Sequence, residues 1–438
     1  MSALPLAAQA GRPPNILFIM LDDLGYADVG AYGQEKIRTP NIDRLAAEGV
    51  RFTNCYSGGA VCAPSRACLM TGLHTGHAPV RANAGTVPIE DEDFTVAEML
   101  KEHGYATGGY GKWGLGDAGS TGVPHRQGFD EFFGYLHQIH AHSYYPDFLW
   151  RNSEKAPLEK GKYSADVIFE RSLQFLRNQR RDRPFFLYAT YTLPHGRHEI
   201  PSAEPYEQQD WPQIEKNYAA MVTRADQYVG ELVKALHPQG LDESTVVFFT
   251  SDNGGTGGGA DATGHRLDFF RSNGNLRGQK GQLYEGGIRV PMIVRWKGRV
   301  QPGTTNELPW AFSDVMPTFA ELAGIRAPKS DGISVLPSIL GRKQAPDRFL
   351  YWETPGFDRS ANRIRPGLPP QAVRWGDWKA VRLKPGSALE LYNLREDLSE
   401  RNDVASEYPQ AVRRIEEYLK TARTEPRPHN TGSFEFVR

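Results

Sequence analysis

The stretch NILFIMLDD, from Asn15 to Asp23, decides the fold. Its apolar run is continuous rather than alternating, which is typical of a strand that is buried on both faces of a parallel sheet. A second run of this kind, TVVFFT from Thr245 to Thr250, is followed at once by the letters SDNG. Because ligands of parallel α/β sheets bind at the carboxyl ends of the strands, both acidic endings are candidate site positions.

Further strands and helices alternate along most of the chain. Apolar runs of strand length stand between segments that have the three-to-four residue spacing of an amphipathic helix. This alternation predicts an α/β fold with a large, mostly parallel sheet that helices cover on both faces. We predict strands at 15–21, 105–109, 185–190, 245–250 and 290–296, and helices at 42–48, 94–103, 164–179, 218–236 and 313–323.

The pattern changes after about residue 341. Short alternating runs at 348–352, 371–375, 378–383 and 389–394 are joined by Gly, Pro and Asp, and an amphipathic segment follows at 408–424. Alternation with a period of two is typical of an antiparallel sheet. We therefore predict a leader at 1–12, a main catalytic domain at 13–340, and a smaller α+β domain at 341–438 whose antiparallel sheet is closed by a helix.

Charge and composition exclude several classes of protein. The 438 residues carry 51 Lys and Arg against 52 Asp and Glu, so nothing indicates a nucleic acid or an anionic membrane surface as a partner. No apolar run approaches the roughly 20 residues that span a bilayer. Three cysteines are too few for a disulfide scaffold, and we expect Cys55 and Cys68 to be buried structural residues.

The N-terminal letters MSALPLAAQAGRPPN contain the small-residue pattern Ala8-Gln9-Ala10 behind a short apolar stretch. This pattern is typical of the end of a secretory signal whose basic and apolar front part is missing. A disordered, alanine-rich leader is the alternative. We expect a periplasmic or extracellular protein.

Two pairs of oxygen-bearing side chains follow buried strands: Asp22 with Asp23, and Asp252 with Asn253. Hard divalent cations such as calcium and magnesium prefer oxygen ligands of this kind. Either pair alone is also what helix caps and turns use. Two adjacent carboxylates repel each other unless a cation neutralises them, and two such pairs at two strand ends favour a metal site.

A cysteine stands in the stretch VCAPSRACLMTG, from Val61 to Gly72. Pro64 and Ser65 suit the first turn of a helix, so Cys62 would lie just before a helix N-terminus, where the helix dipole favours an anion. Arg66 adds a fixed positive charge one turn away. This arrangement favours an oxyanion site beside a reactive side chain, and a buried structural cysteine is the alternative.

With these residues the chain resembles the formylglycine-dependent sulfatase family of the alkaline phosphatase superfamily. The letters CAPSR and LMTG, within Cys62 to Gly72, match that family's signature, which is C-x-P-S-R followed by (L/M)-T-G. The resemblance covers nearly the whole chain and looks most like secreted bacterial arylsulfatases and carbohydrate sulfatases. It implies that a formylglycine-generating maturation enzyme converts Cys62 to Cα-formylglycine, an aldehyde whose hydrate is the nucleophile.

The resemblance also assigns the other site residues. It implies a calcium ion, with magnesium less expected, and a sulfate group held by positive side chains. The blocks GKWGLG at 111–116, LPH at 193–195 and LRGQKGQLYEGGIRVP at 276–291 resemble blocks of the family. The implied metal ligands are Asp22, Asp23, Cys62, Asp252 and Asn253, and the implied catalytic residues are Cys62, Arg66, Lys112, His195 and Lys280. His195 would protonate the leaving alcohol, with Lys280 as the other candidate.

One position departs from the family pattern. Family members usually have Gly-Lys-Trp-His-Leu-Gly, whereas Gly114 stands in place of the histidine here. The segment LHQIHAHSYYP at 136–146 is rich in histidine and aromatic residues. We expect His142, and after it His140, to replace the missing histidine or to contact a sugar, and an ordinary loop role is the alternative.

We therefore expect a sulfatase that hydrolyses sulfate monoesters on a sugar, a galactose or hexosamine unit, and also accepts aryl sulfates. Aromatic faces beside short polar side chains suit a sugar ring. Two alternatives stay open: a phosphonate monoester or phosphodiester hydrolase, and a protein that binds sulfated glycans without turnover. The candidate substrate-binding residues are His140, His142, His265, Asp268 and Arg363.

Overall fold

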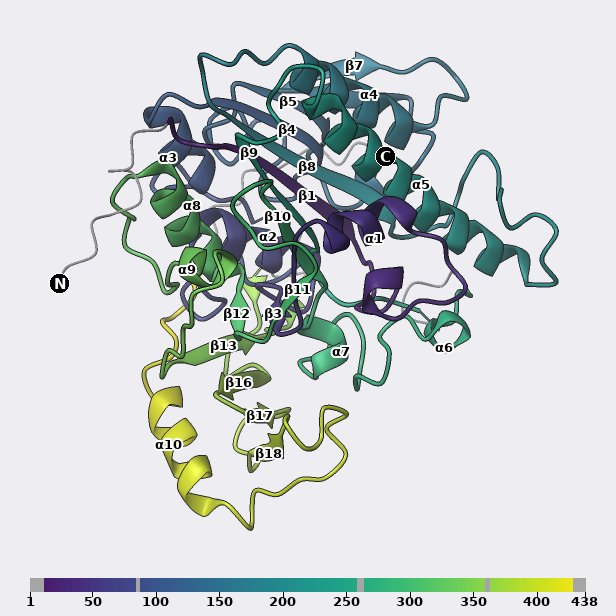
Figure 1. Cartoon of the computed structure of the whole chain (residues 1–438). Coiled ribbons are helices and arrows are strands. Elements are labelled where there is room, and N and C mark those ends of the chain that lie inside the picture. The colour runs from purple at the N-terminus through teal and green to yellow at the C-terminus, as the bar shows by residue number, and fades with distance from the viewer. Residues whose placement is uncertain (1–11, 84–86, 258–263, 359–362, 428–438) are drawn as a thin grey trace.

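Figure 1 shows the computed structural model of the chain, which describes residues 12–83, 87–257, 264–358 and 363–427. Within these residues a ten-stranded sheet has the order β11 (Thr304–Asn306), β2 (Val50–Phe52), β10 (Met292–Arg295), β9 (Thr245–Ser251), β1 (Asn15–Asp22), β8 (Phe185–Pro194), β4 (Ala106–Lys112), β5 (Glu131–Tyr135), β6 (Phe148–Arg151) and β7 (Glu154–Pro157). The central strands from β9 to β5 are parallel. Antiparallel pairs that involve β10 and β6 lie towards the two margins. The predicted mostly parallel sheet is confirmed.

The central strand β1 shows why helices cover both faces of the sheet. Leu17 and Ile19 belong to one buried cluster, whereas Ile16 and Phe18 belong to the cluster on the opposite face. Each such fully buried side chain contributes roughly 1.5–3 kcal/mol to folding. Helices α1 (Pro40–Ala47), α4 (Ser164–Arg177) and α5 (Gln213–Leu236) pack into the first cluster, and α2 (Cys62–Thr71), α3 (Val96–Glu102) and α8 (Val315–Ala323) into the second.

A smaller antiparallel sheet follows in the C-terminal part, in the order β13 (Phe349–Glu353), β16 (Gln371–Trp375), β17 (Trp378–Arg382) and β18 (Glu390–Asn393) among the described residues. Its strands alternate between two faces. Tyr351 faces helix α10 (Pro409–Leu419), whereas Leu350 and Trp352 face the larger part of the molecule. The Trp352 indole donates a hydrogen bond to the Ser57 carbonyl at 2.8 Å and fixes the two sheets against each other. The predicted antiparallel sheet with a closing helix is confirmed.

Most of the other predicted elements have the expected type but different ends. Strand β8 continues past residue 190 to Pro194, and helix α5 begins at Gln213 rather than at 218. Helix α2 begins at Cys62 itself, one position earlier than expected. The shorter elements are β3 (Cys55–Tyr56), β12 (Trp310–Ala311), β14 (Phe357–Asp358), β15 (Arg363–Ile364), α6 (Leu267–Phe270), α7 (Glu285–Ile288), α9 (Leu336–Ile339), η2 (Gly30–Tyr32), η3 (His140–His142) and η4 (Phe312–Asp314).

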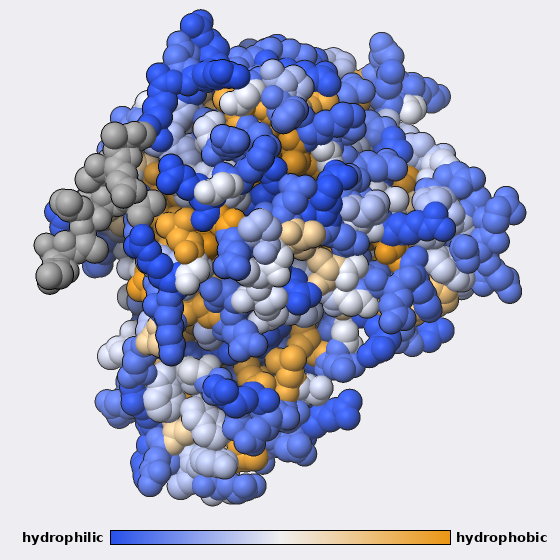
Figure 2. Space-filling view, viewed as in Figure 1, coloured by the Kyte–Doolittle hydropathy of each residue, from blue (hydrophilic) through white to orange (hydrophobic). Residues whose placement is uncertain are grey.

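The surface is mostly hydrophilic on the face shown in Figure 2, with apolar side chains in separate patches. No helix in the described part of the chain combines the length and the apolar character that a membrane span needs. The leader expected at 1–12 lies, apart from Arg12, outside the described residues.

Three neighbouring parallel strands end at the same edge of the large sheet. The pairing of β1 with β8 shifts between Leu21, opposite Tyr191, and Asp22, opposite Pro194. Directly afterwards Asp23 adopts a φ of 63°, in the left-handed region that few residues other than glycine occupy. The chain therefore turns sharply at the end of β1, beside the ends of β8 and β9.

Candidate active site

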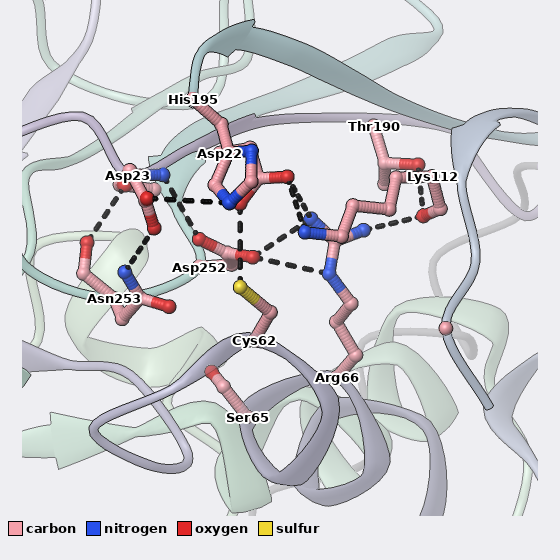
Figure 3. Close-up of polar contacts among 12 residues, drawn as sticks. Asp22, Asp23, Cys62, Ser65, Arg66, Lys112, Thr190, His195, Asp252 and Asn253 are labelled. Atoms are coloured by element: carbon pink, nitrogen blue, oxygen red, sulfur yellow. Dashed lines mark hydrogen bonds and ion pairs between the residues drawn. The ribbon is translucent and has the colours of Figure 1, made fainter. Parts of the chain in front are cut away.

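Acidic side chains from two strand ends meet in the interior (Figure 3). Asp22, Asp23 and Asp252 are all buried. The Asp23 amide donates to Asp252 Oδ1 at 3.2 Å, and Asn253 Nδ2 donates to Asp23 Oδ1 at 2.7 Å. The other atom of that amide, Asn253 Oδ1, is buried and has no hydrogen-bond partner in the described part of the chain. Asn253 Oδ1 is therefore a buried oxygen without a hydrogen-bond partner among the described residues, and it lies beside three carboxyl groups.

Three cations face these carboxyl groups. Lys112 Nζ lies 2.6 Å from Asp22 Oδ2, and Lys280 Nζ lies 2.8 Å from Asp23 Oδ2. Arg66 donates to Asp252 Oδ2 from Nη2 at 2.7 Å and from Nε at 3.1 Å. Helix α2 supplies Arg66, β4 supplies Lys112, and Lys280 comes from the loop before α7. Three positive side chains therefore balance three carboxyl groups in a water-excluded centre.

The pKa values of the three acids are shifted in different directions. Burial opposes ionisation of Asp22, but Lys112 and His195 outweigh it and hold its pKa well below the usual range. Burial raises the pKa of Asp23. Burial and the neighbouring Asp22 raise the pKa of Asp252 to about 6. Two of the three carboxylates are thus costly to keep ionised, which is the situation that a bound cation relieves.

Cys62 lies at the first position of helix α2, inside this centre. Its thiol donates to Asp22 Oδ1 at 3.4 Å. Burial and the negative charge of Asp22 raise the pKa of the thiol to about 12. The thiolate is the nucleophilic form of cysteine, so these surroundings disfavour the reactive form of an unmodified Cys62. Cys55 and Cys68 are also buried and free, as expected for structural residues.

His195 follows directly on strand β8 and faces the same centre. Its Nε2 lies 3.6 Å from Asp23 Oδ2, and its Nδ1 is buried without a hydrogen-bond partner among the described residues. Burial lowers its pKa well below the usual range, so the imidazole is neutral near pH 7. One ligand atom from each of Asp22, Asp23, Cys62 and His195 lies within 4.8 Å of the others, a spacing that a metal ion can bridge.

Two side chains hold the backbone of Lys112 in place, and the sequence had revealed only one of them, Arg66. Thr190 Oγ1 donates to the Lys112 carbonyl at 2.8 Å, and Arg66 Nη1 donates to the same carbonyl. Thr190 stands inside an apolar strand and belongs to no motif, so no sequence pattern indicates this role. It becomes visible only because β8 and β4 are neighbours in the sheet.

The histidine-rich segment places only one of its two candidate histidines against the centre. The ring of His142 meets that of His195 edge to face, with ring centroids 4.5 Å apart. His140 instead packs on Phe148 at 4.8 Å and Tyr135 at 5.0 Å, which is a loop-packing role. Of the two histidines, His142 therefore has the position that a substrate contact requires.

The space beside Gly114 is filled by another residue. Gly114 has a φ of 78°, and a Cβ atom there would lie 2.0 Å from Gln138 Nε2. Gln138 is buried, and its Oε1 has no hydrogen-bond partner in the described residues. A histidine at position 114 would therefore need both a strained backbone and a displaced Gln138.

The remaining candidate substrate residues lie in other surroundings. His265 is fully buried, with Nδ1 2.7 Å from Glu215 Oε2 and its ring stacked on Tyr218. Packing in the core accounts for this position. Asp268 is exposed and pairs with Arg266 at 2.5 Å. The Arg363 side chain lies outside the described residues. Substrate contacts by these three residues stay predictions.

Comparisons with known proteins agree with this fold and centre. The family model described as Sulfatase matches residues 14–325, and the one described as N-sulphoglucosamine sulphohydrolase, C-terminal, matches residues 278–425. The chain is 35% identical to arylsulfatase A of Homo sapiens over 419 residues, which are 88% of this chain and 78% of that protein. It is 29% identical to the N-acetylgalactosamine-6-O-sulfatase of Bacteroides thetaiotaomicron over 509 residues, covering 95% and 94% of the two chains.

A solved structure extends the comparison to three dimensions. The crystal structure of Ps i-CgsB in complex with k-i-k-neocarrahexaose superposes with a TM-score of 0.83 at 29% identity and covers 96% of each chain. The chain therefore belongs to the sulfatase family and is a hydrolase of sulfate esters. Members of this family typically depend on formylglycine and a metal, and the buried Asp-Asp-Cys-His group has the composition that this chemistry needs.

Proposed function

We propose that this sulfatase removes sulfate monoesters from a sugar, a galactose or hexosamine unit, with a formylglycine made from Cys62 and a calcium ion. The observation that carries the proposal is the position of Cys62. A thiol whose reactive form is disfavoured lies 3.4 Å from Asp22 in a centre with three cations. That location suits the precursor of an oxygen nucleophile and gives no use to the thiol itself.

The residues present fit a calcium ion. The donors are oxygens, namely those of Asp22, Asp23, Asp252 and Asn253, and calcium accepts a flexible set of such ligands, whereas magnesium demands a near-ideal octahedron. The unsatisfied Asn253 Oδ1 and the raised pKa values of Asp23 and Asp252 both support a cation at this position. A bound calcium ion would polarise the sulfate group and stabilise the charge that develops on it.

The modified Cys62 would supply an oxygen nucleophile, because the hydrate of an aldehyde carries two hydroxyl groups. The protein's own side chains do the remaining work. A sulfate monoester carries one negative charge over three oxygens, and Arg66, Lys112 and Lys280 place fixed positive charge around it. The Lys280 side chain is 17% exposed, so it forms the boundary between the buried centre and solvent.

Proton delivery to the departing alcohol belongs to His195 in this proposal, with Lys280 as the second candidate. His195 is held at the end of β8 with Nε2 facing Asp23, and a neutral imidazole still carries one N–H to donate. When a sulfate ester is bound close to His195, its negative charge would raise the pKa of the imidazole. Loss of this proton donor would slow substrates with poor leaving groups most.

The sugar part of the proposal is supported by the segment that carries His142. On the same segment Ile139 and Tyr145 are exposed by 53% and 40%, so two large side chains stand in solvent next to the residue that reaches His195. An exposed aromatic face beside an exposed aliphatic side chain suits the apolar face of a sugar ring. The similar N-acetylgalactosamine-6-O-sulfatase supports an amino sugar or galactose as the sulfated unit.

The first experiment is the mass of the tryptic peptide 52–66 from protein of the native host, combined with turnover assays. Conversion of one thiol to the aldehyde removes about 18 Da, and fragmentation should place the change at Cys62 rather than at Cys55. We expect the matured protein to cleave an aryl sulfate faster than the matching aryl phosphonate. Preference for the phosphonate would favour the phosphonate hydrolase. Binding of a sulfated sugar by matured protein without sulfate release would favour the non-catalytic alternative.

The metal is tested by Asp252→Ala. We expect the variant to lose bound calcium, measured by atomic emission, and to lose aryl sulfate turnover by more than roughly a hundredfold, because Asp252 also pairs with buried Arg66. The matched control is Asp182→Ala, at an exposed carboxylate far along the chain that pairs with Arg180. Full activity of Asp252→Ala, or of wild type after exhaustive chelation, would contradict the metal assignment.

A further inference from the structure

A cavity of about 880 Å³ lies between the large sheet and the C-terminal sheet, away from the residues around Cys62. Its wall combines the segment after β2, the residue after α7, the chain before β13 and the turn after β16. No residue of the centre formed by Asp22, Asp23, Cys62 and His195 belongs to that wall. The cavity is therefore a separate space, large enough for a sugar unit.

Two buried arginines lie along this wall, on either side of one tyrosine. The guanidinium carbons of Arg289 and Arg374 each lie 5.3 Å from the centre of the Tyr56 ring. The Tyr56 hydroxyl donates to Glu285 Oε2 at 2.8 Å and accepts from both arginines. These three hydrogen bonds occupy the Tyr56 hydroxyl fully, so it cannot pair with the remaining donors of Arg374.

Positive charge is in excess around this tyrosine. Glu285 Oε2 pairs with Arg289 at 2.6 Å, and Glu285 Oε1 pairs with Lys379 at 2.9 Å. Lys379 also lies 3.3 Å from Glu400, whose pKa is raised by burial to about 7. The ion pairs found in the described part of the chain give Arg374 no carboxylate partner. Three cations, Arg289, Lys379 and Arg374, thus share the negative charge of Glu285 and Glu400.

Arg374 retains donors that the protein does not use. Its Nε donates to the Gly376 carbonyl at 3.1 Å, and its Nη1 donates to Tyr56 and, at 3.5 Å, to Asn54 Oδ1. Among the described residues Nη2 makes no hydrogen bond, although the side chain is only 3% exposed and lines the cavity. A buried guanidinium with a free Nη2, and with no carboxylate at ion-pair distance among the described residues, is a binding position for an oxyanion.

The rest of the wall is partly apolar and also carries charged side chains of both signs, namely Lys343, Arg348, Arg395, Glu307, Asp347 and Asp377. Leu308, Pro309, Leu350 and Leu394 line the same cavity as Arg374. Such a wall favours a ligand with an apolar face as well as an anionic group, which describes the ring of an acidic saccharide better than a free ion. We propose that this cavity is a second binding site, which takes the sulfate or carboxylate group of an acidic saccharide on Arg374. The saccharide part rests on the proposed function, and the oxyanion part does not.

Binding is measured by calorimetry in the full-length Cys62→Ala protein, which cannot be matured and therefore does not consume the ligand. The probes are a sulfated disaccharide, its desulfated form and inorganic sulfate. We expect the sulfated disaccharide to bind at two sites, and Arg374→Gln to weaken one of them by roughly tenfold or more, since a charge-assisted hydrogen bond is removed. The matched control, Arg326→Gln, removes an exposed positive charge and should change neither site.

A second variant keeps the test valid if Arg374→Gln is unstable. Leu398 lines the cavity and is 40% exposed, so Leu398→Trp narrows the space without touching Arg374 and should weaken the same site. Unchanged binding in both variants would overturn the proposal. Equal, Arg374-dependent binding of inorganic sulfate and the disaccharide would overturn the saccharide assignment and leave a free-ion site.

Failure of this proposal and failure of the proposed function are distinguishable. In matured protein, Arg374→Gln should cleave a small aryl sulfate at the wild-type rate, because Arg374 lies outside the Cys62 centre. Absence of aryl sulfate turnover in wild type would contradict the proposed function. The calorimetric effect of Arg374→Gln would still decide whether the cavity binds an oxyanion.

Discussion

At the scale of single residues, Gly114 shows how a backbone conformation limits what the site can contain. Its φ of 78° and the approach of Gln138 exclude a side chain without rearrangement. We expect Gly114→His to lower the free energy of unfolding by roughly 1–3 kcal/mol, from backbone strain and the displaced glutamine. Aryl sulfate turnover should not rise. Urea denaturation and steady-state kinetics provide the two measurements.

The control for this substitution is Gly119→His. Gly119 also has a left-handed φ, of 89°, but a Cβ atom there meets nothing within 4 Å. It therefore isolates the backbone cost, and we expect it to be the less damaging change. Equal destabilisation by the two variants, or faster turnover by Gly114→His, would show that Gln138 does not limit this position.

Asp117 provides a residue-scale prediction about pH. Burial raises its pKa to about 7. The folded protein therefore holds this proton more tightly than the unfolded chain, in which aspartate titrates near about 4. Stability contributed by the protonated form is lost as the pH rises from about 4 to about 7, and no further loss follows above that range.

The variant Asp117→Asn lacks this titration. At pH 8 we expect it to be more stable than wild type by roughly 1–3 kcal/mol, and this advantage should shrink as the pH is lowered to 5. Urea denaturation at several pH values measures the difference. Asp182→Asn, at an exposed carboxylate, is the control and should follow wild type. A constant difference between Asp117→Asn and wild type across this range would contradict the prediction.

At the scale of elements, the 3-10 helix η3 places two histidines, two positions apart, in different surroundings. His142 reaches His195, whereas His140 packs on Phe148 and Tyr135. We expect His142→Ala to lower kcat/KM for a sulfated saccharide by roughly tenfold or more, with an unchanged melting temperature. His140→Ala should instead lower the melting temperature and affect kcat/KM less. The reverse pattern would show that η3 positions His140 toward substrate.

Strand ends explain why residues distant in sequence form one centre. β1, β8 and β9 are parallel neighbours, so their last residues meet at one edge of the sheet. The carboxyl end of β1 brings Asp22 and Asp23, that of β8 brings His195, and that of β9 brings Asp252. Helix α2 then adds Cys62 and Arg66 from its first turn and a half. Three strands and one helix are thus enough to assemble most of the centre.

At the scale of the whole molecule, removal of the metal should lower the stability of the folded state as well as the activity. Without a cation, Asp23 and Asp252 remain buried with raised pKa values. An ion present at a thousand times its Kd stabilises the folded state by about 4 kcal/mol. We expect chelation to lower the melting temperature, and added calcium to restore it more fully than magnesium. This readout does not depend on turnover.

The variant Asp252→Ala is the control for chelation, because its melting temperature should be insensitive to both chelator and calcium. A melting temperature of wild-type protein that does not move on exhaustive chelation would show that no ion supports the fold. In that case the pairs of Arg66, Lys112 and Lys280 with the three carboxylates alone would hold the centre together.

Much of this architecture was predictable because the signals are local. Continuous apolar runs, such as those of β1 and β9, can bury both faces only in the middle of a sheet, so they predicted the α/β class. The acidic endings of those strands predicted the carboxylates of the centre and the Cys62 block predicted Arg66, whereas Lys112 and Lys280 were predicted by the family resemblance of their own blocks. Strand ends were less predictable: β8 continues past Thr190 to Pro194 because its neighbour β1 extends the ladder there, whereas the pairing with β4 stops at Thr190. No local pattern reports this.

The sequence by itself determined which residue types stand at the ends of which strands, and therefore that Asp22, Asp23 and Asp252 lie at one edge of the sheet. The family resemblance of the Cys62 block added Cys62 to the same centre. Only the tertiary structure decided that His142 rather than His140 reaches this centre and that Gln138 fills the space beside Gly114. It also decided that no carboxylate among the described residues lies at ion-pair distance from Arg374. The physical reason is the range of the interactions. Hydrophobic periodicity and strand endings act between near neighbours in the chain, whereas contacts between loops and charge balance in the interior depend on which distant segments the packed fold brings together.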